Sequence, residues 1–162
     1  MGDGLTLLAG WEDGSLQRFE LRGGSGPAAS RRLHSEPLLC IDVDQKSAHA
    51  LSGAADCKLC VTPLAGGALG EPSAQLSVPV TNEASGSGGL SALSCRPDGK
   101  IFAAGGWDRR VRLWQWRKYK PIAVLKHHTA TVHAVDFSPC SRLLATASAD
   151  KTIGVWQLFA PG

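Results

Sequence analysis

The chain has 162 residues, of which 43% are hydrophobic and 19% are charged, so its composition allows a buried core and does not predict disorder. Its 19 glycines and 9 prolines argue against a helical bundle and favour many short elements joined by turns. The formal net charge of +3 is small for a dedicated polyanion binder, and no apolar run is long enough to span a bilayer. Five cysteines without a secretory signal predict reduced thiols and a location in the cytoplasm or the nucleus, with no membrane partner.

Four aspartates mark an internal repeat. Their spacings are 43, 52 and 42 residues, and the aspartates are Asp13, Asp56, Asp108 and Asp150. A small, apolar segment precedes each one, and an apolar branched residue follows it three positions later. Five positions later come Arg18, Val61, Leu113 and Val155. Apolar positions alternate within each unit, which is the period of a strand, and a repeat of about 40 to 45 residues is typical of a four-stranded propeller blade.

In chain order, the repeat predicts fourteen strands. The first unit has two strands before Gly23 and a weak outer strand in residues 27–33. Two complete four-stranded units follow at residues 38–76 and 90–126, separated by a glycine- and serine-rich insertion at residues 81–89 that we expect to be flexible. The last unit supplies three strands, in residues 132–138, 143–148 and 152–158.

These strands predict one open domain made of approximate blades at residues 1–33, 38–76, 90–126 and 132–162. Fourteen strands are half of the roughly 28 in a ring of seven four-stranded blades. The first blade lacks its innermost strand and the last lacks its outermost strand, so the ends do not complete each other. We therefore expect an incomplete part of a seven-bladed ring, poorly soluble on its own, whose partner would be the missing half if the chain is a fragment.

The last unit resembles a WD repeat. Its His127-His128 replaces the usual Gly-His, Phe137-Ser138-Pro139 and Asp150 match, and Trp156-Gln157 replaces the terminal Trp-Asp. The other units are more degenerate, with Thr62 in place of the tryptophan and Gly86 in place of a histidine. The resemblance implies an all-β WD-repeat β-propeller of about four blades of antiparallel four-stranded sheet. More narrowly, residues 8–15 and 148–156 resemble the WD-repeat family related to a subunit of the fungal ASTRA complex.

The same resemblance implies a structural hydrogen-bonded tetrad in the last unit, formed by His128, Ser148, Asp150 and Trp156. The indole N–H of a buried tryptophan needs an acceptor, and a hydroxyl can accept it and pass a hydrogen bond to histidine. The alternative interpretation is a Ser-His-Asp hydrolase triad, but no Gly-x-Ser-x-Gly elbow surrounds the serine. At the hydroxyl position the other units have Trp11, Ala54 and Gly106, so their blades are expected to be softer.

The spacing of two cysteines suggests another chemistry. Cys57 and Cys60 have the spacing of a redox or zinc motif, but no second pair follows, and strand alternation places the two side chains on opposite faces. A thiol enzyme would need an accessible cysteine with a low pKa. We therefore expect no catalytic residue, no metal and no cofactor.

The basic segment at residues 109–126 offers an alternative function as a nucleic-acid- or chromatin-associated module. Its candidate patch is Arg109, Arg110 and Arg112, close to several aromatic residues. The simpler interpretation is that alternate strand residues face solvent while arginine stems cover aromatic rings, and the small net charge makes nucleic acid the less favoured partner.

The favoured prediction is a non-catalytic scaffold that binds other proteins through its loops. By the resemblance, turn residues and the starts of innermost strands open onto one face beside the central channel. The candidate contact residues there are Trp107, Glu12, Trp11, Leu39, Thr131 and His133. The resemblance also implies an adaptor role in multiprotein assembly, either in maturation of phosphatidylinositol-3-kinase-like kinases or in chromatin-linked complexes.

Overall fold

The structure is a computed structural model that describes residues 6–22, 26–44, 46, 48–79 and 88–158. Most of the predicted insertion at residues 81–89 lies outside the described residues. The described part contains fourteen strands and a single 3-10 turn, η1 (Ala65–Gly67). The strands are β1 (Thr6–Gly10), β2 (Ser15–Glu20), β3 (Ala29–Arg32), β4 (Leu38–Val43), β5 (His49–Ala54), β6 (Lys58–Pro63), β7 (Ala74–Ser77), β8 (Leu90–Cys95), β9 (Ile101–Gly106), β10 (Arg110–Gln115), β11 (Lys120–Lys126), β12 (Val132–Phe137), β13 (Leu143–Ser148) and β14 (Ile153–Gln157).

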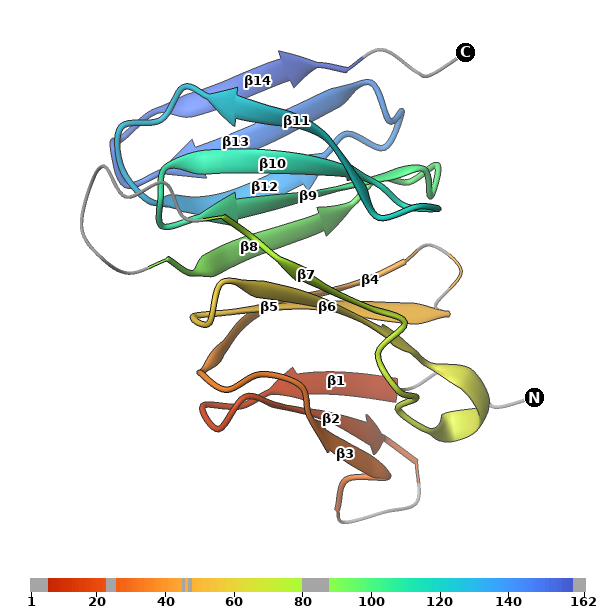
Figure 1. Cartoon of the computed structure of the whole chain (residues 1–162). Coiled ribbons are helices and arrows are strands. Elements are labelled where there is room, and N and C mark those ends of the chain that lie inside the picture. Colours follow the sequence, from red (N-terminus) through yellow and green to blue (C-terminus); the bar gives the residue numbers. More distant parts are fainter. Residues whose placement is uncertain (1–5, 23–25, 45, 47, 80–87, 159–162) are drawn as a thin grey trace.

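The strands form four antiparallel sheets in sequence order, with three, four, four and three strands. Sheet 1 is β1-β2-β3, sheet 2 is β4-β5-β6-β7, sheet 3 is β8-β9-β10-β11 and sheet 4 is β12-β13-β14. Figure 1 shows the sheets stacked as a fan, from sheet 1 in red to sheet 4 in blue at the opposite end. This is the all-β, open arrangement that the repeat predicted.

The innermost strands β4, β8 and β12 lie beside one another and join consecutive sheets. Each has an irregularity at its start, between Leu38 and Cys40, Leu90 and Ala92, and Val132 and Ala134. A bulge bends a strand and increases its twist, so the same distortion recurs where each inner strand enters the centre of the fan.

The core lies between the sheets. Phe102 stacks on Trp114 with ring centroids 5.4 Å apart, in a cluster that joins sheets 2 and 3. A second cluster joins sheets 3 and 4, where Val111 and Leu113 meet Leu144. All six residues of β9 are buried, because the middle sheets are covered on both faces.

The outer faces of the end sheets are apolar and uncovered. Ile153 and Val155 in sheet 4 are 73% and 66% exposed, whereas their equivalents Val111 and Leu113 in sheet 3 are 1% and 3% exposed. Leu7 on the outward side of sheet 1 is 49% exposed. Within the described residues, no helix is both long and apolar enough to cross a membrane.

Candidate functional site

The turns between the second and third strands of sheets 2, 3 and 4 lie at the same end as the starts of the inner strands. The backbone N–H of Trp107 donates to the Gly89 carbonyl over 2.9 Å, and that of Ala149 donates to Thr131 over 2.9 Å. Ala55 donates to Pro37 in the same way over 3.0 Å. In sheet 1 the Trp11 carbonyl accepts the N–H of Leu38 from sheet 2 over 3.1 Å. We call this end of the four sheets the top end.

Each top-end turn is built by its aspartate and the residue after it. In every turn one carboxylate oxygen accepts the backbone N–H of the residue two positions on, at 2.8 to 3.3 Å, in the pairs Asp13–Ser15, Asp56–Lys58, Asp108–Arg110 and Asp150–Thr152. The residue between has a positive φ of 61° to 81°, and these residues are Gly14, Cys57, Arg109 and Lys151. An aspartate side chain that caps its own turn stabilises this conformation, which explains why the aspartate repeats.

Sheet 4 carries a connected polar network. The indole N–H of Trp156 donates to Thr146 Oγ1 over 3.2 Å, and the same hydroxyl lies 2.8 Å from His128 Nε2. His128 Nδ1 lies 3.1 Å from a carboxylate oxygen of Asp150. The predicted hydroxyl was therefore wrong: Ser148 donates to the Ala130 carbonyl over 3.0 Å instead. The structure brings His128, Asp150 and Trp156 together through Thr146.

Asp150 is the acceptor at the end of this network. The hydroxyl of Thr152 donates to it over 2.6 Å, and the backbone N–H groups of Thr129 and Thr152 also donate to it. These hydrogen bonds, led by that of the Thr152 side chain, hold the pKa of Asp150 well below its ordinary value. The aspartate stays ionised and fixes the orientation of the imidazole.

Sheet 2 has a similar network, whose hydroxyl comes from a different position than the sequence predicted. His34 Nε2 lies 2.9 Å from the hydroxyl of Ser52, and Nδ1 lies 3.1 Å from Asp56 Oδ1. The hydroxyl comes from Ser52 rather than from position 54, so this sheet has three of the four groups. Burial lowers the pKa of His34, although Asp56 acts in the opposite direction. The fourth position is Thr62, whose buried Oγ1 has no hydrogen-bond partner among the described residues.

In sheet 3 the turn aspartate pairs with an arginine of β10 instead of with a histidine. Arg112 is 6% exposed and donates to both carboxylate oxygens of Asp108, over 3.0 and 2.6 Å, and to the Pro79 carbonyl over 2.9 Å. The predicted solvent-facing patch is therefore wrong for Arg112. Both faces of sheet 3 are covered, so strand alternation here does not separate buried from exposed residues. Arg109 and Arg110 are half-buried at the turn.

The comparisons with known proteins agree with this geometry. Residues 79–115 and 119–157 match the family described as WD domain, G-beta repeat. The chain contains WD repeats. It is similar to guanine nucleotide-binding protein subunit beta-like protein 1 of Mus musculus, with 37% identity over 94% of the chain and 44% of the relative.

Fungal proteins named ASTRA-associated protein 1 also match. The relative from Verticillium alfalfae is 35% identical over 85% of the chain and 34% of its own length. The relative from Schizosaccharomyces pombe is 31% identical over 78% of the chain and 33% of its own length. The chain thus spans less than half of the length of these curated relatives.

The predicted contact residues all lie at the top end, but their side chains are exposed to different degrees. Trp11 is 48% exposed and Leu39 is 39% exposed. Glu12 and His133 are also exposed, whereas Trp107 and Thr131 are half-buried. Trp107 is held against backbone, because a Cβ placed on Gly89 would lie 2.8 Å from its ring.

The two cysteines with redox or zinc spacing, Cys57 and Cys60, are placed unfavourably for chemistry. Cys57 occupies the positive-φ position of its turn, and Cys60 is buried in β6. Burial raises the pKa of both thiols, so neither is an activated nucleophile. Across the described ranges, no group of three or more His, Cys, Asp or Glu side chains has the geometry to hold a metal ion.

The sequence analysis gave no role to the hydroxyls of Thr146 and Ser52 or to the cationic side chain of Arg18. Thr146 and Ser52 each lie four residues before the turn aspartate, and this shared spacing is the signal that would have found them. Arg18 stands where the other units have valine or leucine, a substitution visible in the repeat itself.

Proposed function

We propose that the chain is a non-catalytic WD-repeat scaffold that binds other proteins through its top end. The observation that carries this proposal is the exposure of Trp11, beside a hydrogen-bonded turn, and of Leu39, at the start of β4. The Trp11 carbonyl accepts the N–H of Leu38, so the two side chains project from backbone segments that touch. Large side chains on a rigid frame bind with little entropic cost, and tryptophan is enriched among residues that dominate interface energetics.

The finer role rests on the relatives. Several similar proteins carry the name ASTRA-associated protein 1, which supports a partner within a multiprotein assembly. The role we propose there is assembly of phosphatidylinositol-3-kinase-like kinases, in the cytoplasm, the nucleus or both. Glu12 and His133 would add polar contacts around the apolar anchors, with Trp107 and Thr131 at the edge of the contact.

The outward apolar faces of sheets 1 and 4 support a second partner surface, which further blades would cover. In sheet 3 the positions equivalent to Ile153 and Val155 are covered by the next sheet. We expect further WD blades to cover Ile153, Val155 and Leu7 in the same way. Size-exclusion chromatography of the chain alone should show association, and a monodisperse monomer with a cooperative melt would contradict this part of the proposal.

The top-end proposal is tested by affinity purification followed by quantitative mass spectrometry. Trp11→Ala with Leu39→Ala should remove a set of co-purified proteins without lowering the melting temperature. Trp107→Ala should remove the same set, together with some loss of stability because its ring packs against Gly89. Ile122→Ala is the matched control, because Ile122 is 53% exposed on the outermost strand β11, away from the top end. An unchanged partner set in the double variant would refute the assignment.

A further inference from the structure

The basic segment at residues 109–126 is divided between the two ends of sheet 3. Arg109 lies in a top-end turn, and the cross-strand pair of Arg110 and Lys126 lies beside it. Arg112 is buried. The other cations of the segment lie at the opposite end, which we call the bottom end, where hairpins join β8 to β9 and β10 to β11. Figure 1 shows these two hairpins together at the right-hand end of sheet 3.

Four exposed cations gather on these two hairpins, and we call them the bottom-end cluster: Lys100, Arg117, Lys118 and Lys120. The hairpins are joined by a hydrogen bond from the backbone N–H of Trp116 to the carbonyl of Lys100, over 2.9 Å. Gln115 pairs with Lys120 on one side and with Ile101, the residue after Lys100, on the other. The cluster is therefore about two strand spacings, or about 10 Å, wide.

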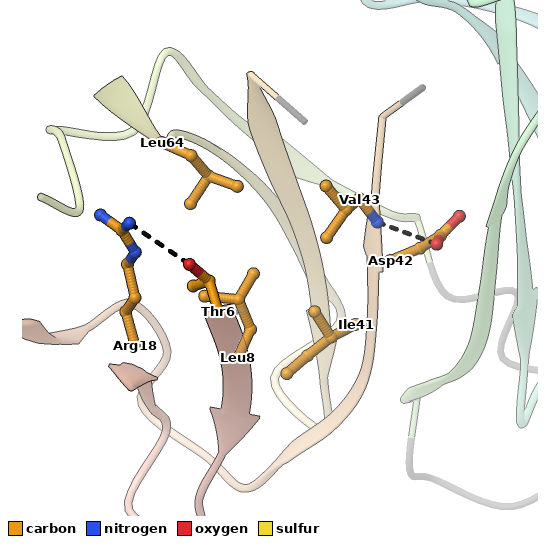
Figure 2. Close-up of a pocket in the computed structure, with 7 residues that line it drawn as sticks. All are labelled: Thr6, Leu8, Arg18, Ile41, Asp42, Val43 and Leu64. Atoms are coloured by element: carbon orange, nitrogen blue, oxygen red, sulfur yellow. Dashed lines mark hydrogen bonds between the residues drawn. The ribbon is translucent and has the colours of Figure 1, made fainter. Parts of the chain in front are cut away.

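Several other cations of the chain already have a carboxylate partner. Arg31 forms an ion pair with Glu71, and Arg112 forms one with Asp108. Arg18 donates to Thr6 at the wall of a cavity between sheets 1 and 2, as Figure 2 shows, and lies 3.9 Å from Glu20. Within the described residues, no side chain of the bottom-end cluster has an ion pair or a hydrogen bond. Its positive charge is therefore available to a partner.

Two carboxylates near the hairpins are occupied by other groups. Asp98 accepts from Nε and Nη2 of Arg96, over 2.8 and 2.7 Å, and from the backbone N–H of Lys100. Arg96 is fully buried, so its charge compensates Asp98 from below the surface. Asp44 lies 3.2 Å from His49 Nδ1 and accepts the backbone N–H of Ala48. Neither carboxylate is directed at the bottom-end cluster.

Aromatic packing fixes the hairpin that carries three of the four cations. Tyr119 has a φ of 51°, a conformation that is unfavourable for a residue with a side chain. Its ring contacts that of Trp116, with centroids 6.4 Å apart, and Trp116 contacts the buried ring of Phe102 at 5.5 Å. The turn is thus anchored to the core between sheets 2 and 3, and its cations project from a fixed backbone.

The same packing favours an acidic peptide over a nucleic acid as the partner. Proteins that bind single strands offer free aromatic rings on which bases stack. The ring of Trp116 instead has contacts with His49, Phe102 and Tyr119. The net charge of +3 is also small for a polyanion binder. An extended peptide of about four residues is about 13 Å long, so carboxylates two or three residues apart match the width of the cluster.

We propose that the bottom-end cluster binds an extended, acidic segment of a partner protein. Single exposed ion pairs are weak, so the affinity comes from several of them formed at once on a backbone that needs no ordering. Arg117 can hold one carboxylate through two parallel hydrogen bonds, and the three lysines act as point charges around it. The surface lies at the opposite end from Trp11 and Leu39, so this proposal does not depend on the top-end contacts.

The probe is a fluorescein-labelled synthetic peptide in which aspartate alternates with serine, titrated with the whole chain and followed by anisotropy. In an extended peptide this alternation places the carboxylates on one side, about 7 Å apart. The matched peptide has asparagine in place of each aspartate. We expect the acidic peptide to bind at least about tenfold more tightly, with a difference that shrinks as salt screens the exposed charges. Equal binding of the two peptides, or no binding at millimolar concentration, would overturn the proposal.

A labelled single-stranded DNA with the same number of charges is titrated in parallel. We expect it to bind more weakly than the acidic peptide, because the aromatic rings of the hairpin are occupied. Tighter binding of the DNA than of the peptide would overturn the proposed partner and assign the bottom-end cluster to nucleic acid.

Two triple variants with equal net charge localise the effect. The first removes three cations of the cluster, by Arg117→Gln, Lys118→Gln and Lys120→Gln, and should bind the acidic peptide about tenfold more weakly, which corresponds to about 1.4 kcal/mol. Its melting temperature should not change, because all three side chains are exposed. The second removes three exposed lysines elsewhere, by Lys46→Gln, Lys126→Gln and Lys151→Gln, and should retain the affinity. Equal weakening in both would show attraction by net charge alone, and retained affinity in the first would refute the assignment.

Discussion

The network in sheet 4 makes a quantitative prediction for Thr146→Val, which removes the hydroxyl and keeps the shape of the side chain. Thr146 is 1% exposed, and its Oγ1 serves both the Trp156 indole N–H and His128 Nε2. Removing it leaves two largely buried groups without a partner, at about 1 to 3 kcal/mol each. Because Trp156 is only half-buried, water can compensate in part, and we expect a loss of about 2 to 4 kcal/mol.

Urea denaturation followed by tryptophan fluorescence measures this loss. With a slope of about 2 kcal/mol per molar urea, the midpoint should fall by about 1 to 2 M. Thr146→Ser keeps the hydroxyl and should cost about 1 kcal/mol for the lost methyl group. Ser148→Ala should cost about 1 kcal/mol, since the Ser148 hydroxyl hydrogen-bonds only to backbone groups, the Ala130 carbonyl and the Asp150 N–H. If Ser148→Ala destabilises as much as Thr146→Val, the role given to Thr146 is wrong.

Three further predictions concern residues at the top-end turns or hydrogen-bonded to them. Arg112→Gln should cost about 3 kcal/mol in urea denaturation, because it leaves the Asp108 carboxylate buried without its ion pair, whereas a solvent-facing arginine would change stability by less than about 0.5 kcal/mol. Gly14→Ala should cost at least about 2 kcal/mol, since φ is 81° and the new Cβ would lie 2.2 Å from the His34 carbonyl oxygen. Its control is Gly66→Ala, where φ is 62° but no atom lies within 4 Å, and a similar loss in both would exclude the steric reason. For His34, burial lowers the pKa from its ordinary 6.5, so below about pH 6.5 the unfolded chain binds a proton that the folded chain does not. The free energy of unfolding should therefore fall as the pH decreases from 6.5, and His34→Gln should flatten that slope; an unchanged slope would show that other groups cause it.

The strand order could be predicted from sequence because two independent signals agree. Alternating apolar residues predict strands, and an aspartate after a small apolar segment marks the tight turn that joins two of them. The count of strands in each sheet followed from the repeat. The resemblance placed His128, Asp150 and Trp156 in a single unit, and in the structure one hydrogen-bonded network links them through Thr146.

The predictions for the Ser148 hydroxyl and for Arg112 were wrong for physical reasons that strand alternation does not capture. Residues 146 and 148 project from the same face of β13, so alternation cannot distinguish which hydroxyl reaches His128. The bulge in β12 changes which residues of β12 and β13 lie opposite each other. Arg112 was expected on a solvated face, yet sheet 3 is covered on both sides.

The principal contacts between sheets join each sheet to the next one along the chain, through β1 and β4, β4 and β8, and β8 and β12. Such a stack behaves like a row of coupled units, in which each unit is stabilised by its immediate neighbours. Sheets 2 and 3 have two neighbours, whereas sheets 1 and 4 have one each. Unfolding should therefore begin at the ends and progress inward, so sheets 1 and 4 belong to the parts of the molecule that open early.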